Sequence, residues 1–153
     1  MSALLAACGG FLLAVLWMDL IFDAQVLGHR RAEGPLPEPV LASIAGYYKR
    51  ATTDSYPMSR LIAVVMGVAV IGSFAHVFTG TGALALRVAA VSLCAAPAGL
   101  ALARIVPRAV RLGSRRDEPA AQSELARAIC RDHLVCLLCV AAFVSTELAL
   151  AVG

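Results

Sequence analysis

Ionisable side chains that interrupt long apolar runs are the residues of this sequence that could do chemistry. Asp19 has apolar neighbours on both sides, and Asp23 follows four positions later, so a helix would place both carboxylates on one face. His133 opens another apolar run, and Arg60 opens a third. Ionisable groups in hydrocarbon are costly, so they face a bundle interior and mark candidate functional sites. We therefore predict that Asp19 and His133 exchange a proton and that Arg60 stabilises an anionic oxygen.

These groups are expected at similar depth in the inner leaflet, where they would border a pocket for a flat, lipophilic molecule. The alternative is that Asp19 only locks helices together through an ion pair or a hydrogen bond, and the sequence leaves this alternative open. The residues expected to line or roof the pocket are Asp23, Asp132, Tyr47, Tyr48, Tyr56, Met18, Phe22 and Met58.

A second polar layer is predicted in the outer half of the membrane. It comprises His76, Arg87 and Glu147. Glu147 and Arg87 have opposite charges at similar depth, which predicts an ion pair between the last two spans. A buried proton or ligand site is the alternative. The last apolar run carries an inward-facing stripe at alternating spacings of three and four, formed by His133, Cys136, Val140, Phe143 and Glu147.

Cys136 and Cys139 form a C-x-x-C pair, which is typical of thiol redox chemistry. Four spans with this motif on the last helix look like the vitamin K epoxide reductase and disulfide-bond formation families, so a thiol–quinone oxidoreductase is one alternative function. Two observations disfavour it: no loop supplies a second cysteine pair, and cysteines three apart in a helix have poor disulfide geometry. A site for iron or manganese from Asp19, Asp23 and His133 is a further alternative, and the sequence assigns no cofactor.

The composition explains why these groups matter. Of 153 residues, 60% are hydrophobic and 15% are charged, and the mean hydropathy is +0.82. Soluble domains are about 45–50% apolar and about 25% charged, so the excess apolar surface must face lipid. The net charge of +3 comes from basic residues that flank apolar runs. This is a topology signal, and it argues against nucleic-acid binding.

Four apolar segments predict an all-α fold, an integral membrane four-helix bundle that forms a single domain over residues 1–153. The expected spans are 3–22, 61–78, 83–106 and 134–152, and the helix of the last span is expected to begin near residue 119.

Twelve of the 13 Lys and Arg residues fall in the loops 23–60 and 104–132 or at their ends. Both long loops are therefore expected in the cytoplasm and both termini outside, most simply in a bacterial cytoplasmic membrane.

A short interfacial helix is predicted in the first cytoplasmic loop. It follows a proline-rich stretch at 35–39 and should end before Pro57. Its tyrosines would lie at the level of the lipid headgroups. Its apolar residues recur at helical spacing: Val40, Leu41, Ile44, Tyr47 and Tyr48.

The length, the four spans, the interfacial helix and the sequence Arg131-Asp132-His133 before the last apolar helix resemble the anthrone oxygenase-like family of small membrane proteins. The resemblance implies a cofactor-independent oxygenase that converts anthrones to anthraquinones with O₂ alone. We therefore expect an oxidoreductase acting on a lipophilic aromatic or quinone-like substrate, with the lipid bilayer and this small molecule as partners. The alternative is a non-catalytic membrane subunit or a small transporter, and a homo-oligomer or a host complex stays open.

Overall fold

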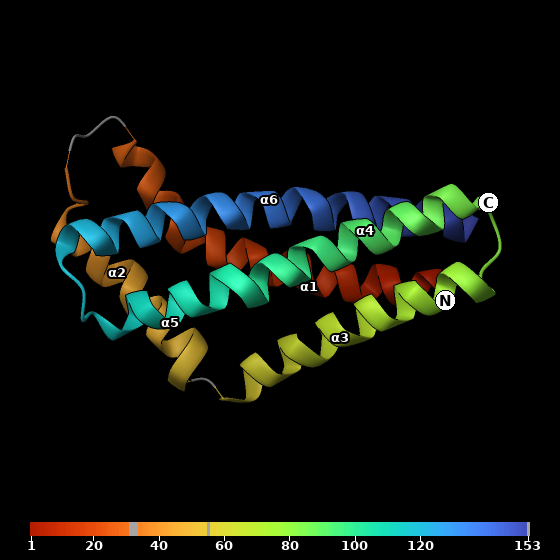
Figure 1. Cartoon of the computed structure of the whole chain (residues 1–153), viewed down its shortest axis with the longest axis horizontal. Coiled ribbons are helices and arrows are strands. Elements are labelled where there is room, and N and C mark those ends of the chain that lie inside the picture. Colours follow the sequence, from red (N-terminus) through yellow and green to blue (C-terminus); the bar gives the residue numbers. More distant parts are fainter. Residues whose placement is uncertain (31–33, 55, 153) are drawn as a thin grey trace.

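A computed structural model describes residues 1–30, 34–54 and 56–152, without the side chain of Tyr56. The described chain is helical and contains no strand, which confirms the all-α prediction. Within it, four helical segments are long and apolar enough to cross a membrane: Ser2–His29, Pro57–Thr79, Leu84–Ser114 and Pro119–Val152. They lie side by side along one axis, with both termini at one end of the bundle (Figure 1).

The four long segments are built from the following helices and turns. The first is α1 (Ser2–Asp23), which tightens into a 3₁₀ turn at Ala24–His29. The second is α3 (Tyr56–Thr79). The third is α4 (Leu84–Leu100), a π turn at Ala101–Ile105 and α5 (Val106–Ser114). The last is α6 (Pro119–Val152), with proline in the first turn, where no backbone donor is needed.

The helical segment that contains the predicted span 83–106 extends beyond it, to Ser114. The helix continues through the π turn at Ala101–Ile105 into α5, where Pro107 falls in the first turn and is therefore tolerated. The continuous helix expected from about residue 119 is confirmed by α6, which at 34 residues is about 51 Å long.

The outward surfaces of the long helices are apolar. Trp17, Ile71, Phe78 and Leu138 are all more than 60% exposed. Water-soluble helices place such side chains in a core and charged ones outside. Apolar side chains on the outside of the bundle are what a helix bundle surrounded by lipid requires.

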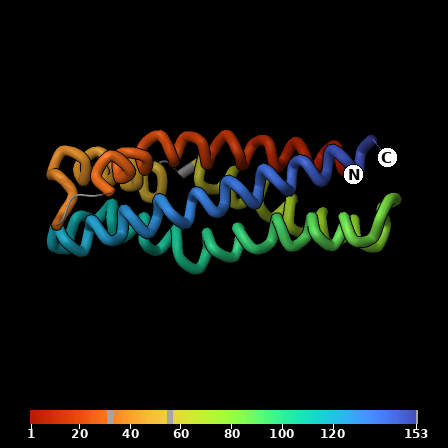
Figure 2. The backbone as a smooth tube through the Cα atoms, turned by 90° about the horizontal axis from the view of Figure 1, so that it is seen from above, coloured from red at the N-terminus to blue at the C-terminus, as the bar shows by residue number. Residues whose placement is uncertain are grey.

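The most extensive contact between two helices in the described chain is between α1 and α6, which run along each other (Figure 2). Gly9 of α1 permits it, because a Cβ atom at Gly9 would lie 2.5 Å from Cγ2 of Val144. Two buried clusters stabilise the ends of the bundle. One includes Leu41, Leu112 and Ile129, and the other Leu5, Ala69 and Phe143.

The predicted short helix of the first loop is present as α2 (Glu38–Lys49), and a π turn at Arg50–Asp54 follows it. Its apolar side, which includes Ile44 and Tyr48, is buried against α5 and α6. Gly113 of α5 allows the close approach, since a Cβ atom there would lie 2.9 Å from the backbone nitrogen of Lys49. As a result, α2 carries its tyrosines to the end of α1.

Candidate functional site

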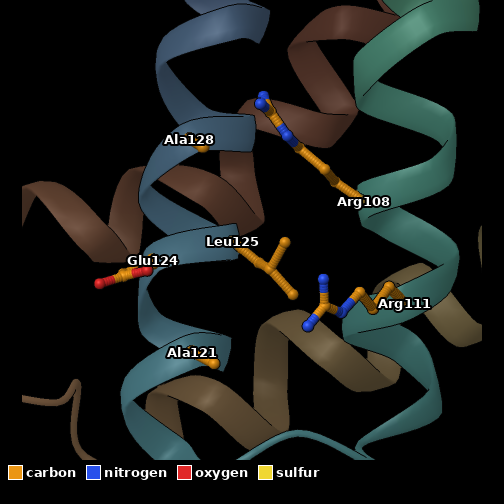
Figure 3. A pocket seen from close by; sticks show the side chains of 6 residues that line it. All are labelled: Arg108, Arg111, Ala121, Glu124, Leu125 and Ala128. Atoms are coloured by element: carbon orange, nitrogen blue, oxygen red, sulfur yellow. The ribbon is translucent and has the colours of Figure 1, made fainter.

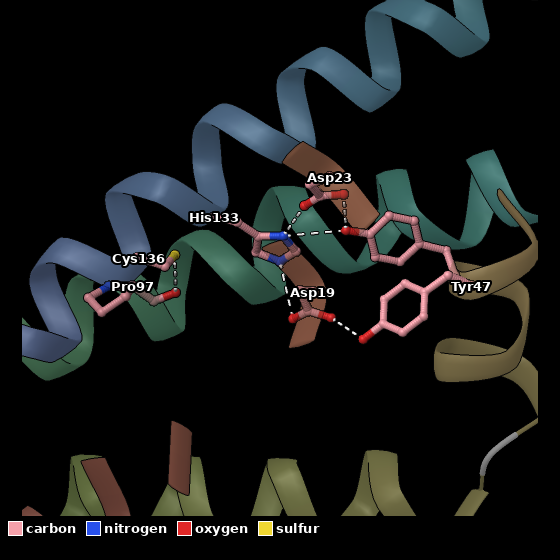
Figure 4. Close-up of polar contacts among 7 residues, drawn as sticks. Asp19, Asp23, Tyr47, Pro97, His133 and Cys136 are labelled. Carbon is pink, nitrogen blue, oxygen red and sulfur yellow. Dashed lines mark hydrogen bonds and ion pairs between the residues drawn. The ribbon is translucent and has the colours of Figure 1, made fainter. Parts of the chain in front are cut away.

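A buried hydrogen-bonded cluster joins α1, α2 and α6 (Figure 4). The carboxylate of Asp23 is fully buried, and its two oxygens have different partners. Oδ2 lies 2.7 Å from Nδ1 of His133, and Oδ1 accepts a hydrogen bond of 2.7 Å from the hydroxyl of Tyr48. The Tyr48 hydroxyl also lies 3.3 Å from the same His133 nitrogen. These three side chains form a closed, water-excluded core.

A second carboxylate approaches the other side of the imidazole. Oδ2 of Asp19 lies 3.7 Å from Nε2 of His133, beyond hydrogen-bond distance. The other Asp19 oxygen accepts a hydrogen bond of 2.6 Å from the Tyr47 hydroxyl. The Asp19 side chain is 15% exposed, in contrast to the sealed Asp23. Asp19 is therefore the more accessible carboxylate of the cluster.

The hydrogen bonds assign a tautomer to His133. Because Asp23 is an acceptor, Nδ1 of His133 carries a proton, and Nε2 then faces Asp19. A second proton can reside either on Nε2 or on the Asp19 carboxyl. An imidazole oriented by one buried carboxylate, with its other nitrogen free to exchange a proton, is the arrangement that general acid–base catalysis requires.

The tyrosines act as neutral donors in this cluster. Burial, and then the negative charge of Asp19, raise the pKa of Tyr47 well above its usual range. Burial, followed by the charge of Asp23, raises the pKa of Tyr48 further still. Both hydroxyls therefore keep their protons at neutral pH and hold the carboxylates in place.

The structure brings together Asp19, Asp23, Tyr47, Tyr48 and His133, all of which the sequence singled out. The residues predicted around them are placed as follows: Phe22 stacks on Tyr47 with ring centroids 4.1 Å apart, Met18 and Met58 are exposed, and the side chain of Tyr56 lies outside the described part of the chain.

Arg60 is exposed in the first turns of α3. The hydrogen-bond and ion-pair partners described for the two carboxylates come instead from α2 and α6. The structure therefore places Arg60 on a different helix from every described partner of Asp19 and Asp23.

Asp132 faces arginines that the prediction did not include. Its Oδ2 accepts a hydrogen bond of 2.6 Å from Arg108 and lies 3.5 Å from Nε of Arg104. The spacing of Arg104, Arg108 and Arg111 by four and three residues predicts that they share one helix face, but it does not indicate which residue that face meets. This pairing fixes α5 against α6 at the position next to His133.

The second polar layer, formed by His76, Arg87 and Glu147, differs from its prediction. Glu147 has His76 as its described ion-pair partner, with Oε2 3.6 Å from Nδ1. The predicted Arg87–Glu147 pair does not form. Instead, Arg87 donates hydrogen bonds to the carbonyl oxygens of His76, Val77 and Gly82. Arginine therefore caps the end of α3, where helix carbonyls lack partners.

The cysteines of the C-x-x-C pair are both free thiols. Cys136 is buried, and its Sγ lies 3.9 Å from the carbonyl oxygen of Pro97, to which it is a weak donor. Pro97 in the interior of α4 removes one backbone donor. The thiol of Cys136 thus packs at the α4–α6 contact (Figure 4).

Two hollows lie on other faces of the bundle. One of about 230 Å³, between α5 and α6, is lined by Arg108, Arg111, Ala121, Glu124, Leu125 and Ala128 (Figure 3). The other, of about 450 Å³, is an apolar groove between α3 and α4 that includes Gly67 and Gly99. In the described parts of the chain, no group of three or more His, Cys, Asp or Glu residues is arranged to hold a metal ion.

Comparisons with protein families, with curated proteins and with solved structures found no match to this chain. The chemistry of the site is therefore argued from its geometry. That geometry offers an oriented imidazole, an exchangeable proton and two neutral hydroxyl donors.

Proposed function

We propose that the chain is an integral membrane oxidoreductase, a cofactor-independent oxygenase that acts on a lipophilic aromatic or quinone-like substrate near the inner interface. The observation that carries the proposal is the placement of His133 between two carboxylates, at 2.7 Å from Asp23 and 3.7 Å from Asp19. The first contact orients the ring, and the second leaves one nitrogen available for proton transfer.

In the proposed reaction, Nε2 of His133 or the Asp19 carboxylate removes a proton from an acidic C–H of the substrate. The resulting oxyanion delivers its electrons to O₂. For an anthrone, the carbon loses two hydrogens and gains a carbonyl oxygen from O₂, and the second oxygen atom leaves as water, so that anthrone and O₂ give anthraquinone and water. Asp23 stabilises the imidazolium formed on the way.

The proposed location is the inner end of the bundle, with both termini outside and both long loops in the cytoplasm. Two features support this orientation. The termini share one end of the molecule, and α2 together with the arginine-bearing α5 lies at the other (Figure 1). Basic residues are retained on the cytoplasmic side. In this orientation the exposed side of α2 would face the lipid interface, and its buried side would cover the cluster around His133.

A second candidate function is a non-catalytic membrane subunit or small transporter in which the cluster only locks three helices together. One observation favours it: Asp23 and Tyr48 are sealed and mutually hydrogen-bonded, as in a structural contact. The two candidate functions differ in the role of Asp19. An oxygenase requires a proton that Asp19 and His133 can exchange, whereas a structural contact between helices does not.

The experiment uses purified full-length protein in detergent, with anthrone and O₂. We expect the wild type to accelerate O₂ consumption and the appearance of anthraquinone absorbance. Asp19→Asn and His133→Ala should abolish this acceleration with unchanged circular dichroism. Asp54→Asn, an exposed carboxylate at the same end, serves as the matched control and should keep full activity.

The outcomes separate the candidates. A wild type that leaves the rate of anthrone oxidation unchanged contradicts the oxygenase proposal. Loss of folded structure in both Asp19→Asn and His133→Ala favours the structural lock. Native mass spectrometry of the wild type provides a second readout, since a co-purified aromatic or quinone that is lost in the Asp19→Asn variant supports a substrate site.

A further inference from the structure

Glu147 is a carboxylate enclosed on all sides in the half of the bundle that holds the termini. Its exposed fraction is 0%. Neither Oε1 nor Oε2 receives a hydrogen bond from the described residues. An isolated carboxylate ion in such a place costs several kcal/mol, so a group of this kind needs a positive partner or a proton.

His76 of α3 is the group that faces it. The ring is buried, and its Nδ1 also has no hydrogen-bond partner among the described residues. This nitrogen lies 3.6 Å from Oε2 of Glu147. The ring is held on its other side, since a Cβ atom at Gly80 would lie 2.2 Å from its Cδ2. The two unpartnered groups are therefore directed at each other.

The other charged and titratable groups nearby do not neutralise the pair. Arg87 of α4 directs its guanidinium to backbone carbonyls at the end of α3. Cys94 of α4 lies close enough to Glu147 and to Cys8 of α1 for an electrostatic interaction, and both cysteines are free thiols. Among the described residues, His76 is therefore the ion-pair partner of Glu147.

We propose that Glu147 and His76 form a second proton-binding site, in which one proton is shared between the carboxylate and the imidazole. A proton fits this pair better than a metal ion does. The pair offers one carboxylate and one imidazole, and no three-residue ligand set for a metal is present among the described residues. A shared proton satisfies Nδ1 and one carboxylate oxygen at once and leaves no net buried charge.

This site is distinct from the cluster around His133. Glu147 lies 14 positions after His133 on α6, which is about 21 Å along a helix. The buried side chains between them on this face are Cys136, Val140 and Phe143, of which the last two are apolar. We therefore expect the Glu147–His76 pair to exchange its proton independently of the cluster around His133. The proposal does not depend on the oxygenase proposal.

The test is labelling of the full-length protein in liposomes with dicyclohexylcarbodiimide. This apolar reagent adds to protonated carboxyl groups that are held away from water, and peptide mass spectrometry locates the adduct. We expect an adduct on Glu147 and its loss in Glu147→Gln. The matched control is Glu124→Gln on the same helix, where Glu124 is exposed, and this variant should label as the wild type does.

The variant His76→Gln tests the sharing of the proton. Without an imidazole to share it, the proton should stay on Glu147, and Glu147 should label faster than in the wild type under the same conditions. An unlabelled Glu147 in the folded wild type would overturn the proposal. Equal labelling of Glu124 and Glu147, or an unchanged labelling rate of Glu147 in His76→Gln, would overturn it as well. Circular dichroism confirms that each variant is folded.

Discussion

Replacing Tyr48 and Tyr47 by phenylalanine in turn compares two nearly identical hydrogen bonds in different surroundings. Tyr48 donates to Asp23 at 2.7 Å, and Tyr47 donates to Asp19 at 2.6 Å. Each substitution removes one hydroxyl and keeps the ring. The two acceptors differ in burial, since the side chain of Asp23 is 0% exposed and that of Asp19 is 15% exposed.

The expected magnitudes follow from that difference. A hydrogen bond to a charged group contributes about 1.5–3 kcal/mol, and a buried acceptor that loses its donor retains the full desolvation penalty. We therefore expect Tyr48→Phe to lower the free energy of unfolding by about 2 kcal/mol. Water can replace the lost donor at Asp19, so Tyr47→Phe should cost about 0.5–1 kcal/mol. The difference of about 1 kcal/mol corresponds to a Tm lower by about 2–4 °C.

The assay is reversible unfolding in mixed micelles, followed by circular dichroism, with both variants measured under the same conditions. Equal losses of stability in the two variants, or a larger loss for Tyr47→Phe, would refute the reasoning. Such a result would mean that Asp23 has access to water or that its contact with His133 suffices to hold it.

Three further outcomes are expected. Gly9→Ala should destabilise the bundle, because its Cβ would lie 2.5 Å from Val144. Gly10→Ala has no atom within 4 Å of its Cβ, so its higher helix propensity should stabilise the bundle by up to about 1 kcal/mol. Unfolding titrations of the two variants measure both effects. Burial and the neighbouring carboxylates raise the pKa of Tyr48 above that of the unfolded chain. Its stabilisation is therefore complete below about pH 10 and is lost as the pH rises, so denaturant midpoints should fall in alkali, and less so in Tyr48→Phe. Trp17, the one tryptophan, is 64% exposed on an apolar surface, so brominated lipids should quench its fluorescence and iodide in water should not; the reverse would place α1 outside the bilayer.

The long helices and most of the cluster around His133 were predictable from the sequence because both depend on local pattern. An apolar run of about 20 residues sets a helix of membrane length, and the spacing of Asp19 and Asp23 sets their common face. The helical spacing of Val40, Leu41, Ile44, Tyr47 and Tyr48 likewise predicted α2. Hydropathy and periodicity alone therefore located four of the five clustered residues on their elements, and His133 followed from its place at the start of an apolar run.

The pairings between helices were not predictable, because they depend on how each helix is rotated about its axis. The π turn at Ala101–Ile105 changes the rotation of α5, so that Arg108 meets Asp132. No residue pattern marks such a turn. The Arg87–Glu147 pair failed for a related reason, since similar depth in the membrane does not determine whether two side chains face each other.

The contact between Asp23 and His133 joins positions separated by 110 residues. At a synthesis rate of about 5–20 residues per second, α6 leaves the ribosome roughly 5–20 s after α1. During that interval the first helix carries two carboxylates without their imidazole partner. A nascent chain that lacks its last helix is therefore unstable in the bilayer, and it can complete its fold only after α6 has been synthesised. During this interval, cellular quality control can recognise the incomplete molecule.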